Sequence, residues 1–212
     1  MKRRSSLVIR KRSSKDKRPT ANNQRRGSVR RGLVPRPPSP VPRVSVGIGY
    51  DIHRFAEGRP LWLGGVEIPH GRGLDGHSDA DALLHAICDA LLGAAGLGDI
   101  GRHFPSSDPS LKGIASVELL RRTQQMIVRA GYRVSNIDAV VIAEEPRLGP
   151  YQERMCAVIA SAADVPVSSV NVKVTSNERM GAIGRAEGIA AYAVVLLTKR
   201  LGYRVTKSPG YQ

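Results

Sequence analysis

The stretch His77-Ser78-Asp79-Ala80-Asp81-Ala82-Leu83-Leu84-His85 predicts the helix around which the rest of this chain is organised. Ser78 and Asp81 have the spacing of a capping box, with Ser78 at the N-cap and Asp81 at the third helical position. Gly93 and Gly96 are candidate ends for the helix. Before these glycines, apolar residues recur at three- and four-residue intervals, as is typical of a buried amphipathic helix: Leu83, Leu84, Ile87, Cys88, Leu91 and Leu92.

A polar stripe interrupts the apolar character of this helix. Asp81, His85 and Asp89 are four residues apart, so their side chains share one face of it. A helical histidine is more often a hydrogen-bonded polar residue than a metal ligand, and capping boxes are common. His85 alone therefore does not indicate a metal site, and a second cluster is needed.

That second cluster lies upstream, in residues 44–53, which alternate in polarity and are rich in β-branched side chains. This pattern predicts a strand with Asp51 and His53 on the same face. Together with His85 they form a set of two histidines and one carboxylate, a usual ligand set for a catalytic zinc ion with one open coordination position. We therefore expect a metal site formed by Asp51, His53 and His85.

The charge of the chain is concentrated in its first residues. Residues 1–43 hold 15 of the 33 Lys and Arg residues but one of the 18 acidic residues, Asp16, so this segment has a net charge of +14 and the remainder +1. The segment also lacks a periodic apolar pattern and cannot bury enough surface to offset chain entropy. We therefore expect a disordered basic extension over residues 1–43, a folded domain over residues 44–200 and a short tail over residues 201–212.

Four roles are open for the basic extension. It is a solvated segment without function, an Arg- and Ser-rich organellar transit peptide, a segment that binds nucleic acid or another anionic surface, or the product of a misassigned start. It contains no aromatic residue for base stacking, which argues against nucleic acid as a partner. Residues 7–9 are too short a run for the apolar region of a signal peptide. The sequence does not decide among these roles.

No segment is predicted to span a membrane. The longest apolar run, residues 188–197, is far below the roughly 20 residues that cross a bilayer. Cys88 and Cys156 both fall in predicted helices among apolar neighbours, so we expect buried free thiols and no disulfide framework. These features predict a cytoplasmic protein, or one in a plastid-type organelle if the basic extension is a transit peptide.

The remaining pattern alternates strands with helices. Two short apolar runs flank Gly64-Gly65, which predicts a hairpin, and two loops are predicted at residues 71–76 and 98–105. Helices are predicted over residues 116–130 and 150–163, and strands over residues 137–143, 170–174 and 187–198. With residues 44–53, these elements predict an α/β fold: a single-domain sandwich of a mainly four-stranded mixed sheet with helices on one side.

Five short motifs carry a resemblance to one enzyme family: Gly49-Tyr50-Asp51-Ile52-His53, His77-Ser78-Asp79, Leu84-His85, Asp99-Ile100-Gly101 and Gly184-Arg185-Ala186-Glu187-Gly188. Their order and spacing are similar to those of 2-C-methyl-D-erythritol 2,4-cyclodiphosphate synthases. The resemblance implies a lyase of the non-mevalonate route to isoprenoid precursors. Such an enzyme converts 4-diphosphocytidyl-2-C-methyl-D-erythritol 2-phosphate to the 2,4-cyclodiphosphate and releases CMP.

The resemblance also implies cofactors and catalytic residues. A Zn²⁺ ion on the Asp-His-His set would hold the β-phosphate, and a Mg²⁺ or Mn²⁺ ion would contact the diphosphate through Glu178. His77 would lie beside the attacking 2-phosphate, and Ser176 would be a second group that stabilises the transition state. Because the nucleophile is the substrate's own phosphate, catalysis would come from positioning and from neutralising phosphate charge.

Substrate contacts implied by the resemblance come from several parts of the domain. Residues 99–101 would line the methylerythritol pocket, and residues 143–149 would form the cytosine slot. Ser106 stands where the family often has an aspartate, and Gly149 and Ala182 are smaller than the residues often found there. The full set is Asp51, Ile52, His53, His77, Ser78, Asp99, Ile100, Gly101, Phe104, Ser106, Asp108, Ala143, Pro146, Arg147, Leu148, Gly149, Thr175, Ser176, Asn177, Glu178, Ala182 and Arg185.

The family resembled here forms homotrimers with active sites between subunits, so a trimer is implied for this chain. The apolar last strand suits that assembly and would equally suit an ordinary core. Two other classes stay open. One is a metal-dependent phosphohydrolase in which the same three residues activate water. The other is a nucleic-acid-binding protein that acts through the basic extension, which salt-dependent binding would reveal.

Overall fold

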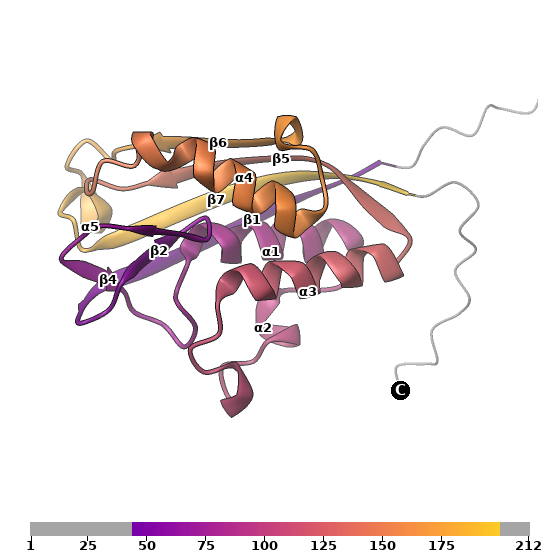
Figure 1. Ribbon diagram of the computed structural model, residues 1–212, viewed down its shortest axis with the longest axis horizontal. Helices are drawn as coiled ribbons and strands as arrows, with labels where there is room; N and C mark the ends of the chain where they lie inside the picture. The colour runs from indigo at the N-terminus through magenta and orange to yellow at the C-terminus, as the bar shows by residue number, and fades with distance from the viewer. Residues whose placement is uncertain (1–43, 200–212) are drawn as a thin grey trace, which may run out of the picture. The chain divides into compact units, whose positions relative to one another are not determined.

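The computed structural model describes residues 44–199 of the chain. The predicted extension at residues 1–43 and the predicted tail at residues 201–212 lie outside the described residues, as does Arg200. Within the described part, five strands form one mixed sheet in the order β4-β1-β7-β5-β6, and β2 and β3 form a separate hairpin (Figure 1).

The elements follow one another along the chain in a mixed α/β order. The strands are β1 (Val44–Glu57), β2 (Leu61–Leu63), β3 (Val66–Ile68), β4 (Arg72–Leu74), β5 (Tyr132–Ile142), β6 (Val170–Thr175) and β7 (Gly188–Lys199). The α-helices are α1 (Ala82–Ala95), α2 (Ile100–His103), α3 (Ser116–Arg129), α4 (Gln152–Ala163) and α5 (Gly181–Gly184). Short 3₁₀ turns are η1 (Pro109–Leu111), η2 (Gly149–Tyr151) and η3 (Val167–Ser169).

The sheet combines both strand orientations. β1 is antiparallel to β4 and β7, β7 is antiparallel to β5, and β5 is parallel to β6. The four long strands are those expected from the sequence. A fifth strand, β4, contradicts the predicted loop at residues 71–76. Its Gly73 marks a close approach rather than a turn, because a Cβ there would lie 2.3 Å from the carbonyl oxygen of Pro60.

The helices cover one face of the sheet, as predicted: α1, α3 and α4 lie on the same side in Figure 1. Alternate residues of β7 point into this layer and are buried, namely Ile189, Ala191, Ala193, Val195 and Leu197. The opposite face leaves large apolar side chains exposed on β1 and β7, namely Val44, Val46, Ile48, Tyr50, Ile52, Tyr192 and Val194. The domain is thus a two-layer sandwich with one uncovered apolar sheet face.

Two glycines of β1 allow α1 to lie directly on the strand. A Cβ added to Gly47 would be 2.0 Å from the carbonyl oxygen of Ala90, and one added to Gly49 would be 1.9 Å from that of Ala86. Only glycine fits at such distances. The contact between Gly49 and Ala86 also brings the neighbouring residues of the two elements, including His85, close to one another.

The helix α1 begins later than the sequence predicts. Its N-cap is Asp81 and not Ser78, because the Asp81 carboxylate accepts the Leu84 N–H at 3.0 Å. The Ser78 hydroxyl instead accepts the Ala80 N–H. The buried Asp81 carboxylate also accepts the Gly64 and Gly65 N–H groups at 2.9 and 2.7 Å, so it joins the β2–β3 turn to the helix. Of the two candidate ends, Gly96 is the one that ends the helix, and it does so in the left-handed conformation.

Other boundaries differ because tertiary pairing extends the strands. β1 runs to Glu57 and β5 starts at Tyr132, where partners on β7 and β4 continue the ladder. The short helix α2 lies inside the predicted loop at residues 98–105. Among the thiols, Cys88 is buried as predicted, and burial raises its pKa to about 12, whereas Cys156 is only half-buried. No helix within residues 44–199 is long and apolar enough to cross a membrane.

The close approach of α1 to β1 yields a stability prediction. Gly49→Ala should lower the free energy of unfolding by about 3 kcal/mol, because the new methyl group meets the Ala86 carbonyl and the helix must shift. Gly93→Ala is the control: it lies in α1 with open space around it, and should raise stability by up to about 1 kcal/mol. Urea titration measures both. Equal stability of the Gly49 variant and the wild type would contradict the packing described.

Candidate active site

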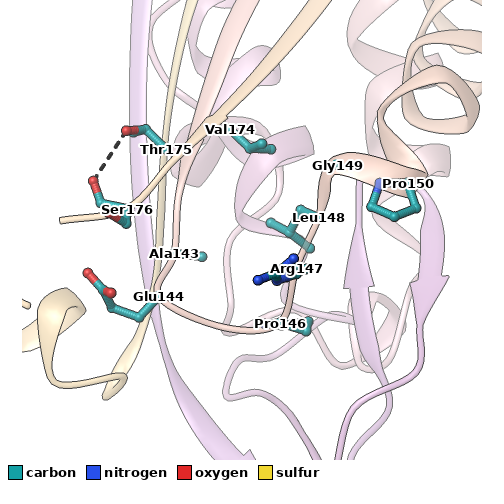
Figure 2. Close-up of a pocket in the computed structure, with 10 residues that line it drawn as sticks. All are labelled: Ala143, Glu144, Pro146, Arg147, Leu148, Gly149, Pro150, Val174, Thr175 and Ser176. Atoms are coloured by element: carbon teal, nitrogen blue, oxygen red, sulfur yellow. Dashed lines mark hydrogen bonds between the residues drawn. The ribbon is translucent and has the colours of Figure 1, made fainter. Parts of the chain in front are cut away.

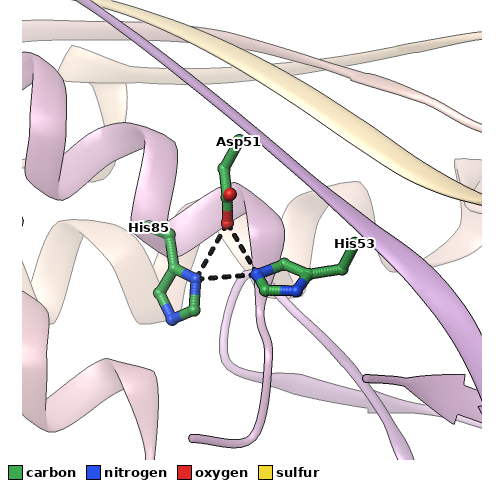
Figure 3. Close-up of side chains that lie close together, drawn as sticks. All are labelled: Asp51, His53 and His85. Atoms are coloured by element: carbon green, nitrogen blue, oxygen red, sulfur yellow. Dashed lines mark hydrogen bonds and ion pairs between the residues drawn. The ribbon is translucent and has the colours of Figure 1, made fainter. Parts of the chain in front are cut away.

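Three side chains converge where β1 passes α1. Asp51 and His53 extend from the same face of β1, and His85 faces them from the helix (Figure 3). The Asp51 Oδ2 atom lies 2.9 Å from His53 Nε2 and 2.8 Å from His85 Nδ1, and the two ring nitrogens are 3.2 Å apart. Within residues 44–199, this is the group of three His, Cys, Asp or Glu side chains whose donor atoms are close enough to hold one metal ion.

The spacing and chemistry of these three donors fit a divalent metal. Two ligands about 2.0 Å from a tetrahedral ion are about 3.3 Å apart, close to the distances found here. His53 Nδ1 is 2.6 Å from the backbone oxygen of Asp75, to which its N–H donates, so the Nε2 lone pair faces the other donors. Two imidazoles and a carboxylate make a mixed N/O donor set suited to first-row divalent ions.

The electrostatics of the cluster show how strongly its members interact. Desolvation raises the pKa of Asp51, but hydrogen bonds to His53 and His85 outweigh it and hold this pKa well below its usual range. Burial lowers the pKa of His53, yet the Asp51 carboxylate more than compensates and raises it. The site therefore keeps its carboxylate ionised, as a metal ligand must be.

A cavity of about 230 Å³ opens beside the three donors. Its walls contain seven of the expected site residues: His53, His77, Ser78, His85, Ile100, Phe104 and Ser106. Three apolar residues that the sequence reasoning did not include complete the wall, Leu111, Ile114 and Leu119. These belong to η1, to the start of α3 and to the segment between them. The sequence did not indicate that they line the cavity, because apolar residues in an amphipathic pattern are interpreted as core residues.

Three expected residues near this cavity shape its backbone. Asp99 caps α2 by accepting the Arg102 N–H at 2.9 Å, and Asp108 caps η1 by accepting the Ser110 N–H at 2.9 Å. Gly101 lies within α2. Asp89, from the polar stripe of α1, accepts the Ile100 N–H at 2.7 Å and so ties α2 to the helix that carries His85.

The loop that carries His77 is held by an arginine that the sequence did not reveal. Arg59 donates to the carbonyl oxygens of Gly76 and Ser78, at 2.7 and 2.5 Å, on either side of His77. The His77 ring lies 3.3 Å from the backbone oxygen of Asp108 and stays exposed. Arg59 sits in the turn after β1, outside the five motifs, and its contacts with the His77 loop are seen only in the folded chain.

A second cavity, of about 470 Å³, lies between β5, β6 and η2 (Figure 2). Seven expected residues line it: Ala143, Pro146, Arg147, Leu148, Gly149, Thr175 and Ser176. Glu144, which falls within the predicted slot at residues 143–149, also lines it, as do Val174 and Pro150, which were not expected. The Glu144 carboxylate accepts the N–H groups of Asn177 and Arg179, at 2.8 and 3.1 Å, which fixes the segment after β6. The sequence signal for this role was the position of Glu144, an acidic residue directly after the predicted strand at residues 137–143.

The other expected residues lie at the edges of these two cavities or away from them. Glu178 accepts a hydrogen bond from Ser176 at 3.1 Å and is not part of the three-donor cluster. Ile52 points to the uncovered sheet face, opposite Asp51 and His53. Ala182 lines a separate hollow with His53 and Arg72. Arg185 donates to Glu187 at 2.6 Å in an exposed ion pair.

Comparison with known proteins places this geometry in a family. The model of the YgbB family matches residues 44–198, which is nearly the whole described domain. The chain belongs to the YgbB family. One relative, the 2-C-methyl-D-erythritol 2,4-cyclodiphosphate synthase of Syntrophobacter fumaroxidans, is 64% identical over 152 residues, which are 72% of this chain and 96% of the relative. The resemblance drawn from the sequence motifs is thereby confirmed.

Solved structures agree with the YgbB assignment. The bifunctional IspDF from Campylobacter jejuni superposes with a TM-score of 0.73 at 42% identity, covering 76% of this chain and 44% of that larger one. IspF of Plasmodium falciparum, solved as a CDP complex, superposes with a TM-score of 0.65 at 32% identity, covering 74% of this chain and 97% of that chain.

The three-donor cluster yields a prediction about metal content. His85→Ala should remove most of the bound divalent ion, because two donors do not replace three. The fold should persist, since α1 keeps its buried leucine face. His103→Ala, which removes a histidine outside the cluster, should keep the ion. Elemental analysis of the purified chains, with circular dichroism as the fold check, measures this. Full metal content in a folded His85 variant would contradict the site.

Proposed function

We propose that this chain is the cyclodiphosphate synthase of the non-mevalonate route to isoprenoid precursors. It converts 4-diphosphocytidyl-2-C-methyl-D-erythritol 2-phosphate to 2-C-methyl-D-erythritol 2,4-cyclodiphosphate and CMP, a phosphorus–oxygen lyase reaction. The observation that carries the proposal is the converged Asp51, His53 and His85 set. It lies in a chain that covers 96% of a synthase with which it is 64% identical.

The reaction needs no nucleophile from the protein. An oxygen of the substrate's 2-phosphate attacks the β-phosphorus, the bond from that phosphorus to the bridging oxygen breaks, and CMP leaves with the electron pair. The protein must hold the two phosphates in line and offset their negative charge. Both tasks require cationic groups, N–H donors and a cavity shaped to the substrate. The two cavities described above meet the last of these requirements.

Zinc is the ion that suits the three donors best, because two imidazoles and one carboxylate leave a fourth tetrahedral position open. When bound, it supplies charge neutralisation at the β-phosphate and a template for its orientation. A second divalent ion, Mg²⁺ or Mn²⁺, would fit the diphosphate, and Glu178, whose carboxylate accepts a hydrogen bond from Ser176, would be its protein ligand. His53, with its N–H committed to the Asp75 carbonyl, is held ready for the zinc ion.

The remaining residues have roles that follow from their places. His77, exposed at the mouth of the metal cavity, is placed to donate to the attacking 2-phosphate, while Arg59 holds its loop. Ile100, Phe104 and neighbouring apolar residues suit the methylerythritol carbons. Thr175 and Ser176 offer hydroxyl groups to the α-phosphate at one end of the larger cavity.

The larger cavity is proposed as the cytidine site. Its lining combines the backbone of residues 143–149 with the Arg147 side chain and the strand end at Thr175. Backbone N–H and C=O groups can read a base edge without a charged side chain. The CDP complex of the Plasmodium falciparum relative supports a nucleotide ligand for this fold.

A homotrimer with sites between subunits is part of the proposal. The metal cavity and the cytidine cavity share no lining residue within one chain, so a neighbouring copy is expected to bring them together on one substrate. The uncovered sheet face offers the apolar area for such an interface: Val46 and Ile48 on β1 are 66% and 70% exposed. A cytoplasmic location and the domain boundaries at residues 43 and 200 stay predictions.

Isotope labelling tests the proposed reaction against hydrolysis. Intramolecular attack benefits from effective concentrations of about 10⁵ M or more when groups are well oriented. An ion held by Asp51, His53 and His85 would neutralise phosphate charge rather than activate water. Turnover in ¹⁸O-labelled water should therefore give CMP and a cyclic product without label, as read by mass spectrometry. One labelled oxygen per turnover in a linear product would make the chain a phosphohydrolase. The His85→Ala chain should release CMP more than about 100-fold more slowly.

A further inference from the structure

A chain of hydrogen bonds runs from the back of His85 to a carboxylate. His85 Nδ1 faces the metal position, and its other nitrogen, Nε2, lies 3.0 Å from the hydroxyl of Ser116 and 3.1 Å from that of Ser78. The Ser116 hydroxyl donates to Asp79 Oδ1, and the Ser116 N–H donates to Asp79 Oδ2 at 2.9 Å. Ser116 is fully buried at the start of α3.

The direction of each proton in this chain follows from what each group can do. An ionised carboxylate only accepts, so the single hydroxyl proton of Ser116 goes to Asp79. The Ser116 oxygen then has only lone pairs left for His85, and Nε2 must carry the N–H. The Ser78 hydroxyl can rotate to suit either form of the ring, so it does not oppose this arrangement. A neutral imidazole with its proton on Nε2 has its lone pair on Nδ1. That lone pair faces Asp51 Oδ2, 2.8 Å away, so this tautomer is favoured when a cation lies between the two atoms.

We propose that Asp79 and Ser116 are positioning residues that hold His85 in the Nε2–H tautomer and so keep its Nδ1 lone pair aimed at the metal. The inference rests on the metal site proposed above and adds two residues to it. Neither touches the metal position. Asp79 acts through Ser116, and Ser116 acts through His85, as outer partners of metal-bound histidines do.

The two ends of this relay also connect separate elements. Asp79 belongs to the loop before α1, Ser116 to α3 and His85 to α1. The backbone bond from Asp79 N–H to the Ile114 carbonyl, at 3.2 Å, holds the same two segments together. The ring orientation of His85 is therefore coupled to the packing of α3 against the metal cavity, of which Ile114 forms part.

The test is zinc affinity of the purified full chain, measured by competition with a chromophoric chelator. Asp79→Asn keeps the shape of the side chain, but its amide can donate to Ser116 and turn the hydroxyl proton toward Nε2, which places the ring proton on Nδ1. Ser116→Ala removes the acceptor that Asp79 orients and leaves Nε2 with the rotatable Ser78 hydroxyl. Each variant should bind zinc about 10- to 100-fold more weakly than the wild type. Asp164→Asn, the same change in an exposed left-handed position, should bind as the wild type does.

A second readout reports the ring proton itself. Proton–nitrogen NMR correlation of the zinc-loaded wild-type chain should show a His85 Nε2–H that exchanges slowly with solvent because Ser116 holds it, and the zinc-loaded Asp79→Asn chain should show faster exchange of that proton. A wild-type chain that binds zinc, with both folded variants binding it equally well, overturns the relay and leaves the metal site standing. So does a zinc-loaded wild-type chain in which the His85 Nε2–H exchanges as fast as it does in the Asp79→Asn chain. A wild-type chain that does not bind zinc overturns the metal site and the relay together.

Discussion

The backbone of α1 rests on the backbone of β1, and the rest of the site depends on that contact. Side chains would normally keep a helix and a strand well apart, but Gly47 and Gly49 remove them, and the carbonyl oxygens of Ala90 and Ala86 occupy the space. At this separation the short carboxylate of Asp51 reaches the ring of His85 directly. A wider gap would leave two half-sites, one on each element, with donors too far apart to share an ion.

Polar groups on an otherwise apolar helix are costly unless each has a partner, and here each has one. Asp81 ties the helix to the hairpin turn, His85 joins the metal cluster, and Asp89 holds α2 against the cavity. The stripe therefore works as three anchors along one edge of the helix. Each anchor fixes a different neighbouring segment to α1. The positions of the cavity walls therefore depend on the position of α1.

Sequence reasoning found the parts of this site that follow from periodicity. The strand face shared by Asp51 and His53, the helix face of His85 and the buried leucines all follow from spacing alone. It failed where a residue's partner is distant in the chain. The N-cap of α1 moved to Asp81 because the hairpin turn supplies two of its three N–H partners. Likewise β4 exists only because β1 pairs with it, and Arg59, Ser116 and Glu144 show their roles only once the loops that they hold are folded.

The central claim is that one ion sits between these three donors, and anomalous X-ray scattering tests it most directly. Crystals of the chain grown with zinc should be measured on both sides of the zinc absorption edge. The account predicts one anomalous peak per chain, within bonding distance of Asp51 Oδ2, His53 Nε2 and His85 Nδ1. Ordered side chains with no peak between them, or zinc bound elsewhere on the chain, would contradict it.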